Sequence, residues 1–574
     1  MQKKKWKLLS LTDSSEHIME LSRRYGLPPV VTTILLKRGL ESFDDYVFPG
    51  TDKLHDPFLM KGMSEAVKRI ICALAQGEHI TVYGDYDVDG ITSTAILVRF
   101  LRERGAFVSY YIPDRTEEGY GINREAIDYI AAEGNTLIIT VDCGITAVKE
   151  VAHANTLGVD VIVTDHHECK DNVPEAIAVL NPKQPDCLYP FKKLAGVGVV
   201  FKLLQALARE LKLHAEELMD SCIDIVSLGT VADVMPLIGE NRIIVKRGLE
   251  LMGYTQNRGL RALIRQADVD PAHITTGTIG FVLAPRINAA GRIGDPKTAV
   301  SLLLSENDKI ACEFAYQLDE TNRERQAIEQ GIYEEALAML AADKSYEEDA
   351  VIVLAHEGWH HGIIGIVASK ITEKLNKPAI LISLMQGMGK GSGRSIKGFN
   401  LFEALSFCEK DLVKFGGHEL AAGLTVNEEN LPDFCRHINQ YAKEILSDGK
   451  CVPELVIDAE LPIAYMNLNT VDKLCVMMPY GMGNAAPVFL CRGLTVLSLR
   501  PMSEGKHMRL TVTDGTYVVD AVGFSMGEYL QNLSVHDCID IVFQLDSNVF
   551  RGERRVQVLL KDLRLSAQVG GNHG

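Results

Sequence analysis

The stretch His79-Ile-Thr-Val-Tyr-Gly-Asp-Tyr-Asp-Val-Asp-Gly90 joins a short apolar run to three aspartates spaced two residues apart. Residues 79–83 have the length and the β-branched content of a buried strand. Asp85, Asp87 and Asp89 follow this run directly. In α/β sheets, ligands bind at the carboxyl ends of the strands. The stretch therefore predicts a strand and, at its end, a polar site.

Three more apolar runs, 106–112, 136–141 and 159–164, follow at helix-length intervals, and each ends in polar residues. The last two end in Asp142 and in Asp165-His166-His167. Strands separated by helices imply a parallel sheet with right-handed crossovers. We therefore expect an α/β domain whose acidic strand ends meet at one edge.

The cluster expected at this edge consists of carboxylates and imidazoles: Asp85, Asp87, Asp89, Asp142, Asp165, His166, His167 and, farther along the chain, Asp233. So many acids beside neutral imidazoles are unstable unless cations compensate them. Mixed oxygen and nitrogen ligands suit Mn²⁺ best, and Mg²⁺ also fits. Two such ions would support phosphoryl transfer.

The rest of the chain changes character twice. Residues 241–300 hold nine Arg and Lys against four acids, and residues 310–340 predict one long amphipathic helix. A second, glycine-rich α/β unit follows, with strands expected at 350–354 and 379–382. From about residue 451, apolar and polar residues alternate with a period of two, as in β-strands. Five short strands there predict an oligonucleotide-binding (OB) type barrel, with a sandwich as the alternative.

Composition limits the possible classes of protein. The 574 residues, 47% of them hydrophobic, predict several globular domains, and the net charge of −17 argues against nonspecific binding of polyanions. The twelve cysteines form no C-x-x-C pair, so we expect reduced thiols. No run reaches the roughly 18 apolar residues of a membrane span, so no membrane association and a cytoplasmic location are expected.

In order and spacing, seven motifs of this chain resemble the DHH phosphoesterase superfamily and, within it, bacterial exonucleases specific for single-stranded DNA. They are Gly84-Asp-Tyr-Asp-Val-Asp-Gly90, Val141-Asp-Cys-Gly144, Asp165-His-His167, Ala232-Asp-Val-Met-Pro-Leu237, Pro285-Arg-Ile-Asn-Ala-Ala-Gly-Arg292, Gly391-Ser-Gly-Arg-Ser395 and Phe415-Gly-Gly-His418.

The resemblance implies a parallel-sheet DHH domain joined by a long helix to a second α/β domain of the DHHA1 kind, followed by the OB-type barrel. The expected divisions are an N-terminal segment packing on the catalytic core (1–68), the DHH domain (69–240), a basic helical connector (241–345), the DHHA1-like domain (346–450), the barrel (451–566) and a flexible tail (567–574).

The resemblance also implies roles for the clustered residues. One metal ion would be held mainly by Asp87 and Asp142, and the other by Asp89, Asp142, His166 and Asp233, with Asp142 as the bridge. Asp85, Asp165 and His167 would support the metals or contact the scissile phosphate. Pyrophosphatase-like relatives carry a histidine four residues before the Asp87 position, where this chain has Tyr83.

Substrate would be bound by side chains outside the acidic cluster. The resemblance implies that Ser392 and Arg394, helped by Arg115, form a pocket for a terminal phosphate. The residue types are compatible with this role, because glycines allow close approach and guanidinium groups bind phosphate bidentately. The other candidates for contacts with bases or strand phosphates are Tyr120, Arg286, Asn288, Arg292, Gly417 and His418.

The function implied is a Mn²⁺- or Mg²⁺-dependent exonuclease that degrades single-stranded DNA from the 5′ end to mononucleotides, in recombination and repair. A monomer is expected, with single-strand-binding protein and a RecQ-type helicase as partners. Two alternatives remain open: a phosphodiesterase acting on oligoribonucleotides or cyclic dinucleotides, and a non-catalytic replication scaffold. RNA in place of DNA is not excluded.

Overall fold

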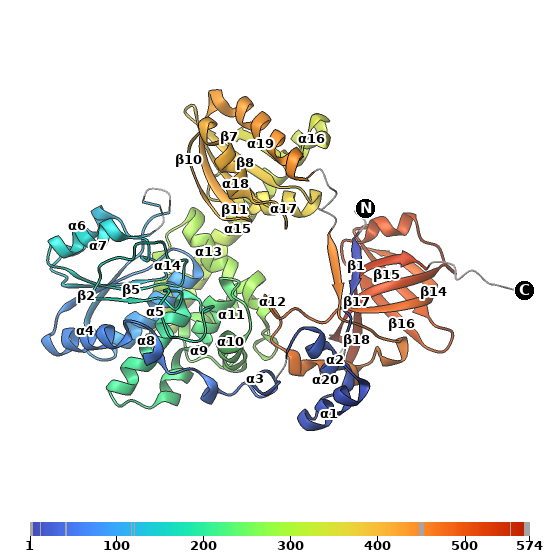
Figure 1. Cartoon of the computed structure of the whole chain (residues 1–574), viewed down its shortest axis with the longest axis horizontal. Helices are drawn as coiled ribbons and strands as arrows, with labels where there is room; N and C mark the ends of the chain where they lie inside the picture. The colour runs from blue at the N-terminus through green and yellow to red at the C-terminus, as the bar shows by residue number, and fades with distance from the viewer. Residues whose placement is uncertain are drawn as a thin grey trace, which may run out of the picture. The chain divides into compact units, whose positions relative to one another are not determined.

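The computed structural model describes residues 4–11, 13–40, 43–115, 118–119, 121–446, 453–550 and 553–566. The chain divides into two compact units, Leu54–Cys451 and Met1–Lys53 with Val452–Gly574 (Figure 1). Across the described ranges, none of the helices combines the length and the hydropathy that a membrane span needs.

The first sheet of unit Leu54–Cys451 has five parallel strands in the order β3-β2-β4-β5-β6. Its strands are β2 (His79–Tyr83), β3 (Phe107–Tyr111), β4 (Leu137–Val141), β5 (Asp160–Thr164) and β6 (Ala178–Leu180). The helices around it are α4 (Met63–Gln76), α5 (Val88–Arg102), α6 (Arg124–Ala132), α7 (Val148–Thr156) and α8 (Gly196–Glu210). The predicted α/β fold is confirmed.

The central strand β4 is buried on both faces, as parallel sheets covered by helices require. Leu137 and Ile139 pack into the core that contains α4, α5 and α8, whereas Ile138 packs into the core that contains α6 and α7. Because helices cover both faces of the sheet, the carboxyl ends of its strands are the part that remains open to a ligand.

A helical region follows the sheet. Its helices are α9 (Ala215–Ala232), α10 (Gly239–Met252), α11 (Arg258–Gln266), α12 (Thr276–Thr278), the π-helix η4 (Ile279–Leu283), α13 (Ala284–Ile293) and α14 (Lys297–Leu304). The predicted long helix is α15 (Asp308–Ala342), which begins where the Asn307 side chain accepts the amides of Lys309 and Ile310.

The second sheet of this unit has the order β10-β11-β9-β8-β7, in which only β7 and β8 are parallel. Its strands are β7 (Ile352–Glu357), β8 (Ala379–Met385), β9 (Met388–Arg394), β10 (Leu412–Gly417) and β11 (Ala421–Asn427). Its helices are α16 (Ser345–Glu348), α17 (Ile364–Leu375), α18 (Leu401–Phe407) and α19 (Leu431–Leu446).

The glycine-rich segment that contains Ser392 and Arg394, expected to bind a terminal phosphate, is part of strand β9. Its glycines lie on the packed side: a Cβ at Gly391 would lie 2.8 Å from Leu424, and one at Gly393 would lie 2.8 Å from Leu401. Alternation along the strand therefore places Ser392 and Arg394 together on the other side.

The second unit is built on a closed barrel. β14 (Phe489–Met502), β15 (His507–Thr513), β16 (Val518–Gly523), β18 (Glu553–Leu565) and β17 (Cys538–Phe550) pair in this order, and β14 also pairs with β17. The closure confirms the OB-type barrel and excludes the sandwich. Short elements precede it: β12 (Glu454–Ile457), β13 (Ala459–Glu460) and α20 (Leu468–Leu474).

The prediction that residues 1–68 form one segment on the catalytic core is wrong for residues 1–53, which belong to the unit of the barrel. β1 (Lys5–Leu8) pairs with β12, and Val31, Ile34 and Leu35 of α2 (Pro29–Lys37) share a core with the barrel strands. The apolar side of α2 is the physical reason, because the barrel side chains cover it. This region also contains α1 (Ser15–Tyr25) and α3 (Asp44–Val47). The predicted tail 567–574 lies outside the described residues.

Candidate metal centre and arginine cluster

The aspartates after β2 are fixed by the start of helix α5. Asp87 is the N-cap of α5, and its Oδ1 accepts the amides of Asp89 at 2.9 Å and Gly90 at 3.1 Å. A Cβ at Gly90 would lie 2.5 Å from the carbonyl oxygen of Asp85, so this turn requires glycine. The turn therefore holds three carboxylates at one edge of the sheet.

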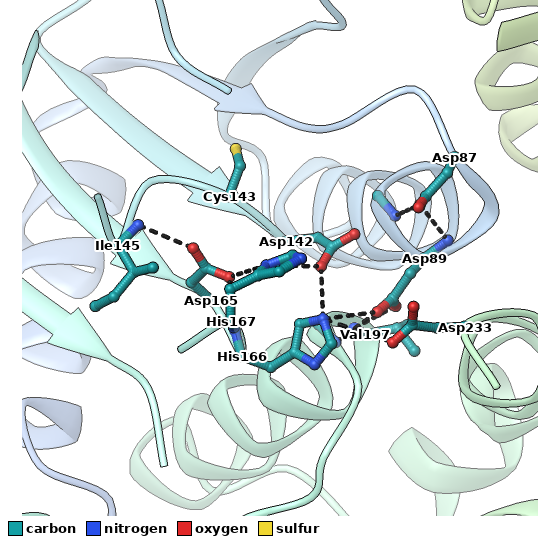
Figure 2. A network of polar contacts seen from close by, with 12 residues as sticks. Asp87, Asp89, Asp142, Cys143, Ile145, Asp165, His166, His167, Val197 and Asp233 are labelled. Carbon is teal, nitrogen blue, oxygen red and sulfur yellow. Dashed lines mark hydrogen bonds and ion pairs between the residues drawn. The ribbon is translucent and has the colours of Figure 1, made fainter. Parts of the chain in front are cut away.

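The amino end of helix α8 holds Asp89. The carboxylate accepts the amide of Gly196 at 2.6 Å and the amide of Val197 at 2.7 Å, as Figure 2 shows for Val197. Free amides at a helix start stabilise an anion. A Cβ at Gly196 would lie 2.6 Å from Oδ1 of Asp142, so the glycine allows Asp89 and Asp142 to approach the same helix end.

Two residues at this edge have left-handed backbone. Asp142 has φ of 59° at the end of β4, and Val234, directly after Asp233, has φ of 56°. This region is strained for a β-branched residue, and such strain concentrates at functional sites. The strained residue Val234 thus lies next to Asp233, and Asp142, whose residue type tolerates this backbone, is itself a predicted metal ligand.

His166 lies at the centre of the acidic cluster (Figure 2). Its Nε2 lies 3.2 Å from Asp142 Oδ1, 3.5 Å from Asp233 Oδ2 and 3.9 Å from Asp89 Oδ2. Three groups of side chains place their ligand atoms within 4.8 Å of one another: Asp85, Asp87 and Asp142; Asp89, His166 and Asp233; and Asp142, His166 and His167. The structure thus brings the predicted metal ligands together.

Asp165 is buried and serves its neighbours as an acceptor. Its Oδ1 accepts the amides of His166 at 2.7 Å and His167 at 3.1 Å and contacts His167 Nδ1 at 2.7 Å, while Oδ2 accepts the amide of Ile145 at 2.8 Å. Asp165 therefore orients both histidines.

Burial dominates the electrostatics of the cluster. It raises the pKa of Asp85 to about 8 and that of Asp233 to about 7, with Asp87 adding to both shifts, and it raises the pKa values of Asp89 and Asp142 strongly. Burial, helped by the charge of His167, lowers the pKa of His166 to about 4. The cluster without cations is thus held partly protonated.

The pKa values of His167 and Asp165 shift in the opposite directions to those of His166 and the other aspartates. Burial acts against both charges, but the hydrogen bond between the two side chains outweighs it, so the pKa of His167 is raised and that of Asp165 is lowered. The two side chains form a charged pair beside the partly neutral cluster.

The donor set fits divalent cations. Among the described residues, Oδ1 of Asp85 and Nδ1 of His166 are buried without a hydrogen-bond partner, and each could serve a cation or a water. Carboxylates with imidazole match Mn²⁺ or Mg²⁺. Tyr83 is no part of this set, since its hydroxyl donates to the carbonyl of Gly121 at 3.1 Å.

A cluster of guanidinium groups accompanies the acids. Arg292 on α13 donates from Nη1 to the carbonyl of Gly362 at 2.9 Å. Burial, with the charges of Arg115, Arg325 and Arg394, lowers the pKa of Arg292 to about 10, and burial with the charge of Arg115 lowers the pKa of Arg394. Cations gathered in this way repel one another unless an anion lies between them.

The arginine cluster reaches the metal centre. The guanidinium carbon of Arg115 lies 5.1 Å from the centre of the Tyr86 ring, between Asp85 and Asp87 in sequence. Arg394 donates to Ser392 Oγ at 3.2 Å, and Gly365 of α17 lets helix and strand approach, since a Cβ there would lie 2.8 Å from Ser392 Oγ.

Of the other predicted substrate-binding residues, the structure places only some beside the metal centre. Asn288 Oδ1 accepts the amide of Val88 at 3.2 Å, beside the metal centre. Arg286 is held elsewhere, by a 2.8 Å ion pair with buried Asp319. Gly417 and His418 form the turn from β10 to β11, where His418 donates its amide to the Ala421 carbonyl at 2.8 Å. Tyr120 lies outside the described residues.

Sequence reasoning missed the residues that act through their backbone. The amides of Gly196 and Val197, the carbonyl of Gly362 and the close approach at Gly365 carry no side-chain signal. Only the glycines at two helix starts hint at them.

Three family models match the chain: the DHH family N-terminal domain at residues 79–230, the DHHA1 domain at 348–444 and the RecJ OB domain at 457–562. The single-stranded-DNA-specific exonuclease RecJ of Bacillus subtilis is 39% identical over 557 residues, covering 96% of this chain and 70% of that protein.

Solved structures agree. RecJ from Thermus thermophilus in complex with Mn²⁺ superposes with a TM-score of 0.85 at 32% identity, covering 98% of this chain and 80% of the other. The same protein in complex with Mg²⁺ gives a TM-score of 0.79 at 31% identity, covering 98% and 79%. With three family models matching in domain order and with RecJ relatives similar over most of the chain, the chain belongs to the RecJ family.

Proposed function

We propose that this chain removes mononucleotides from the 5′ end of single-stranded DNA and takes part in recombination and repair. A single-stranded-DNA exonuclease is the activity of the family, and the metal cofactor is Mn²⁺ or Mg²⁺. The observation that carries the proposal is the arginine cluster of Arg115, Arg292 and Arg394 directly beside the buried carboxylates. A terminal phosphate between those arginines would lie next to the reacting centre.

Asp87 and Asp142, with Asp85 nearby, would hold one ion, and Asp89, His166 and Asp233, with Asp142, would hold the other. When bound, such ions lower the pKa of a water and neutralise charge on the phosphate. The chain fixes this ligand set through Asp87 as a helix cap and through the amides at the start of α8.

The residues around the ions would position the strand. Ser392 and Arg394 lie on the same side of β9, and together with Arg115 they would hold the end phosphate. His167, kept charged by Asp165, would contact the scissile phosphate. End binding and hydrolysis would then be coupled, because both depend on one placement of the strand.

The proposal also covers the role of the barrel, the oligomeric state, the location and the protein partners. The barrel would bind the strand beyond the active site through cationic and aromatic side chains. The chain would act as a monomer in the cytoplasm, with single-strand-binding protein and a RecQ-type helicase as partners. A cyclic dinucleotide has no free terminal phosphate, so it would leave the arginine cluster unused.

The test compares Arg394→Ala on strands that differ only at the 5′ end. On 5′-phosphorylated strands we expect kcat/KM to fall between one and two orders of magnitude, about the 1.5–3 kcal/mol of a charge-assisted contact. Strands with a 5′-hydroxyl should lose much less. The matched control is Arg436→Ala, an exposed arginine of the same domain that pairs with Asp433.

An equal fall on both ends would show that Arg394 serves general strand affinity or folding. Cutting of circular single strands by the unmodified protein would contradict end recognition altogether. A 3′-labelled strand read alongside a 5′-labelled one settles the polarity.

A further inference from the structure

Phe281 is an aromatic side chain that the fold leaves in solvent. It is 86% exposed, more than any other large hydrophobic residue of the described chain. It lies in the π-helix η4, and π-helical turns occur frequently at functional sites. Burial of an exposed phenyl ring is favourable, so a position with this exposure invites a ligand with an apolar face.

The helix backbone beside Phe281 leaves room for a planar ligand. A Cβ at Gly280 would meet no atom within 4 Å, and one at Gly277 would meet only Thr275 Oγ1 at 3.5 Å. The backbone at Gly277 and Gly280, next to Phe281 in the helix, is therefore open on the side where a Cβ would project. A planar group could approach the ring face and the backbone together.

Helix geometry connects Phe281 with the active site. Helical backbone runs from Thr276 to Ile293 through α12, η4 and α13 (Figure 1). Pro285, Asn288 and Arg292 follow one another at steps of three and four, which places them on one side of α13, and Phe281 lies about one helical turn before Pro285 in the π-helix.

A strand held at the arginine cluster would meet the side chains of this helix side in a fixed order. Arg292 belongs to the arginine cluster proposed for the end phosphate, and Asn288 lies against Val88 between the metal-binding Asp87 and Asp89. Phe281 comes next in the same direction, roughly 10 Å beyond Asn288 at 1.5 Å per residue. That is about three nucleotides of a stacked strand at 3.4 Å each.

We propose that Phe281 stacks on a base of the single-stranded substrate about three nucleotides beyond the metal centre, and so keeps the strand in register between cleavages. The partner is a nucleobase, because the strand leaving the metal centre is polyanionic and only its bases offer an apolar face. Aromatic stacking does not discriminate between bases, as degradation of any sequence requires. Phe281 is thus a positioning residue, and its role rests on the proposed function.

The experiment measures Phe281→Ala and Phe281→Trp on 5′-phosphorylated strands of two, three, six and twelve nucleotides. For Phe281→Ala we expect kcat/KM to fall at least fivefold on the six- and twelve-nucleotide strands, within the range measured for a stacked base. The two- and three-nucleotide strands should keep the unmodified rate, and Phe281→Trp should keep the rate at every length.

A second measurement locates the base. Strands carrying 2-aminopurine at successive positions are bound without metal, and quenching that depends on Phe281 should peak near the fourth nucleotide. The matched control is Phe107→Ala. Phe107 is also exposed (62%), but it lies at the amino end of β3, whereas the metal centre lies at the carboxyl ends of the strands.

An equal loss at all lengths, or a lowered melting temperature of Phe281→Ala, would overturn the proposal in favour of a structural role. No loss on the twelve-nucleotide strand would overturn it as well. These outcomes are distinct from failure of the proposed function, in which the unmodified protein would not degrade 5′-phosphorylated strands from the end.

Discussion

His167 Nδ1 lies 2.7 Å from Oδ1 of Asp165, and the same carboxylate accepts the amides of His166, His167 and Ile145. One buried side chain thus accepts at both oxygens and sets the orientation of both histidines. An amide in place of the carboxylate offers only one acceptor oxygen, so it cannot satisfy all of these donors.

Asp165→Asn should therefore reduce kcat by about 10- to 100-fold, the usual effect of losing a residue that orients metal-site ligands. The pKa of His167 should fall, because the hydrogen bond and charge of Asp165 outweigh burial in raising it. A histidine titration by NMR on the metal-free protein measures this shift. An unchanged pKa of His167 would show that Asp165 is not its dominant partner.

Asp142→Asn should abolish hydrolysis and leave the fold intact. Asparagine tolerates the left-handed backbone at this position, where φ is 59°. Burial and four neighbouring carboxylates raise the pKa of Asp142, so a neutral side chain should also raise the melting temperature of the metal-free protein. Activity above about a tenth of the unmodified rate, roughly 1.4 kcal/mol of barrier, would contradict the bridging role.

Four of the five strands of the first sheet could be predicted, because each follows from an apolar run that ends in polar residues, whereas the short strand β6 (Ala178–Leu180) was missed. β2, predicted at 79–83, spans His79–Tyr83, and its aspartates lie in the site as expected. Such local signals are sufficient where a strand is buried on both faces.

Strand β9 could not be predicted in this way, because glycine is unfavourable in strands. Gly391 and Gly393 fit because Leu424 of β11 and Leu401 of α18 occupy the space where a Cβ would project, and neither contact can be seen from the strand's own sequence. The same holds for α2, whose apolar side identifies no partner until the barrel is formed. Phe281 was missed for the opposite reason, since an apolar residue in a helix predicts burial.

The division into units predicts how truncations behave. A chain that ends at residue 451 but keeps residues 1–53 should aggregate, because Val31, Ile34 and Leu35 lose the barrel that buries them. The fragment 54–451 should remain soluble and retain hydrolysis of very short strands, with a much larger loss on long strands. Size-exclusion chromatography and rates on both lengths check this. Equal losses at both lengths would make the barrel a structural brace.

The raised pKa values of the acidic cluster predict how metal binding depends on pH. Without metal, Asp85 with a pKa of about 8 and Asp233 with a pKa of about 7 hold protons that a cation must displace. Because both folded-state values lie above the ordinary value of 3.8, the folded state binds more protons than the unfolded state between about pH 4 and 8. The metal-free protein should therefore lose stability as pH rises through this range.

Mn²⁺ should reverse this trend. Binding compensates the carboxylates, so the increase in melting temperature caused by Mn²⁺ should be small at pH 5.5 and grow steadily to pH 8, with proton release seen by calorimetry in buffers of different ionisation enthalpy. Asp85→Asn serves as the control, because it removes one titrating group and should flatten the metal-free pH dependence. A Mn²⁺ effect that is constant from pH 5.5 to 8 would show that the acids are already ionised before the metal arrives.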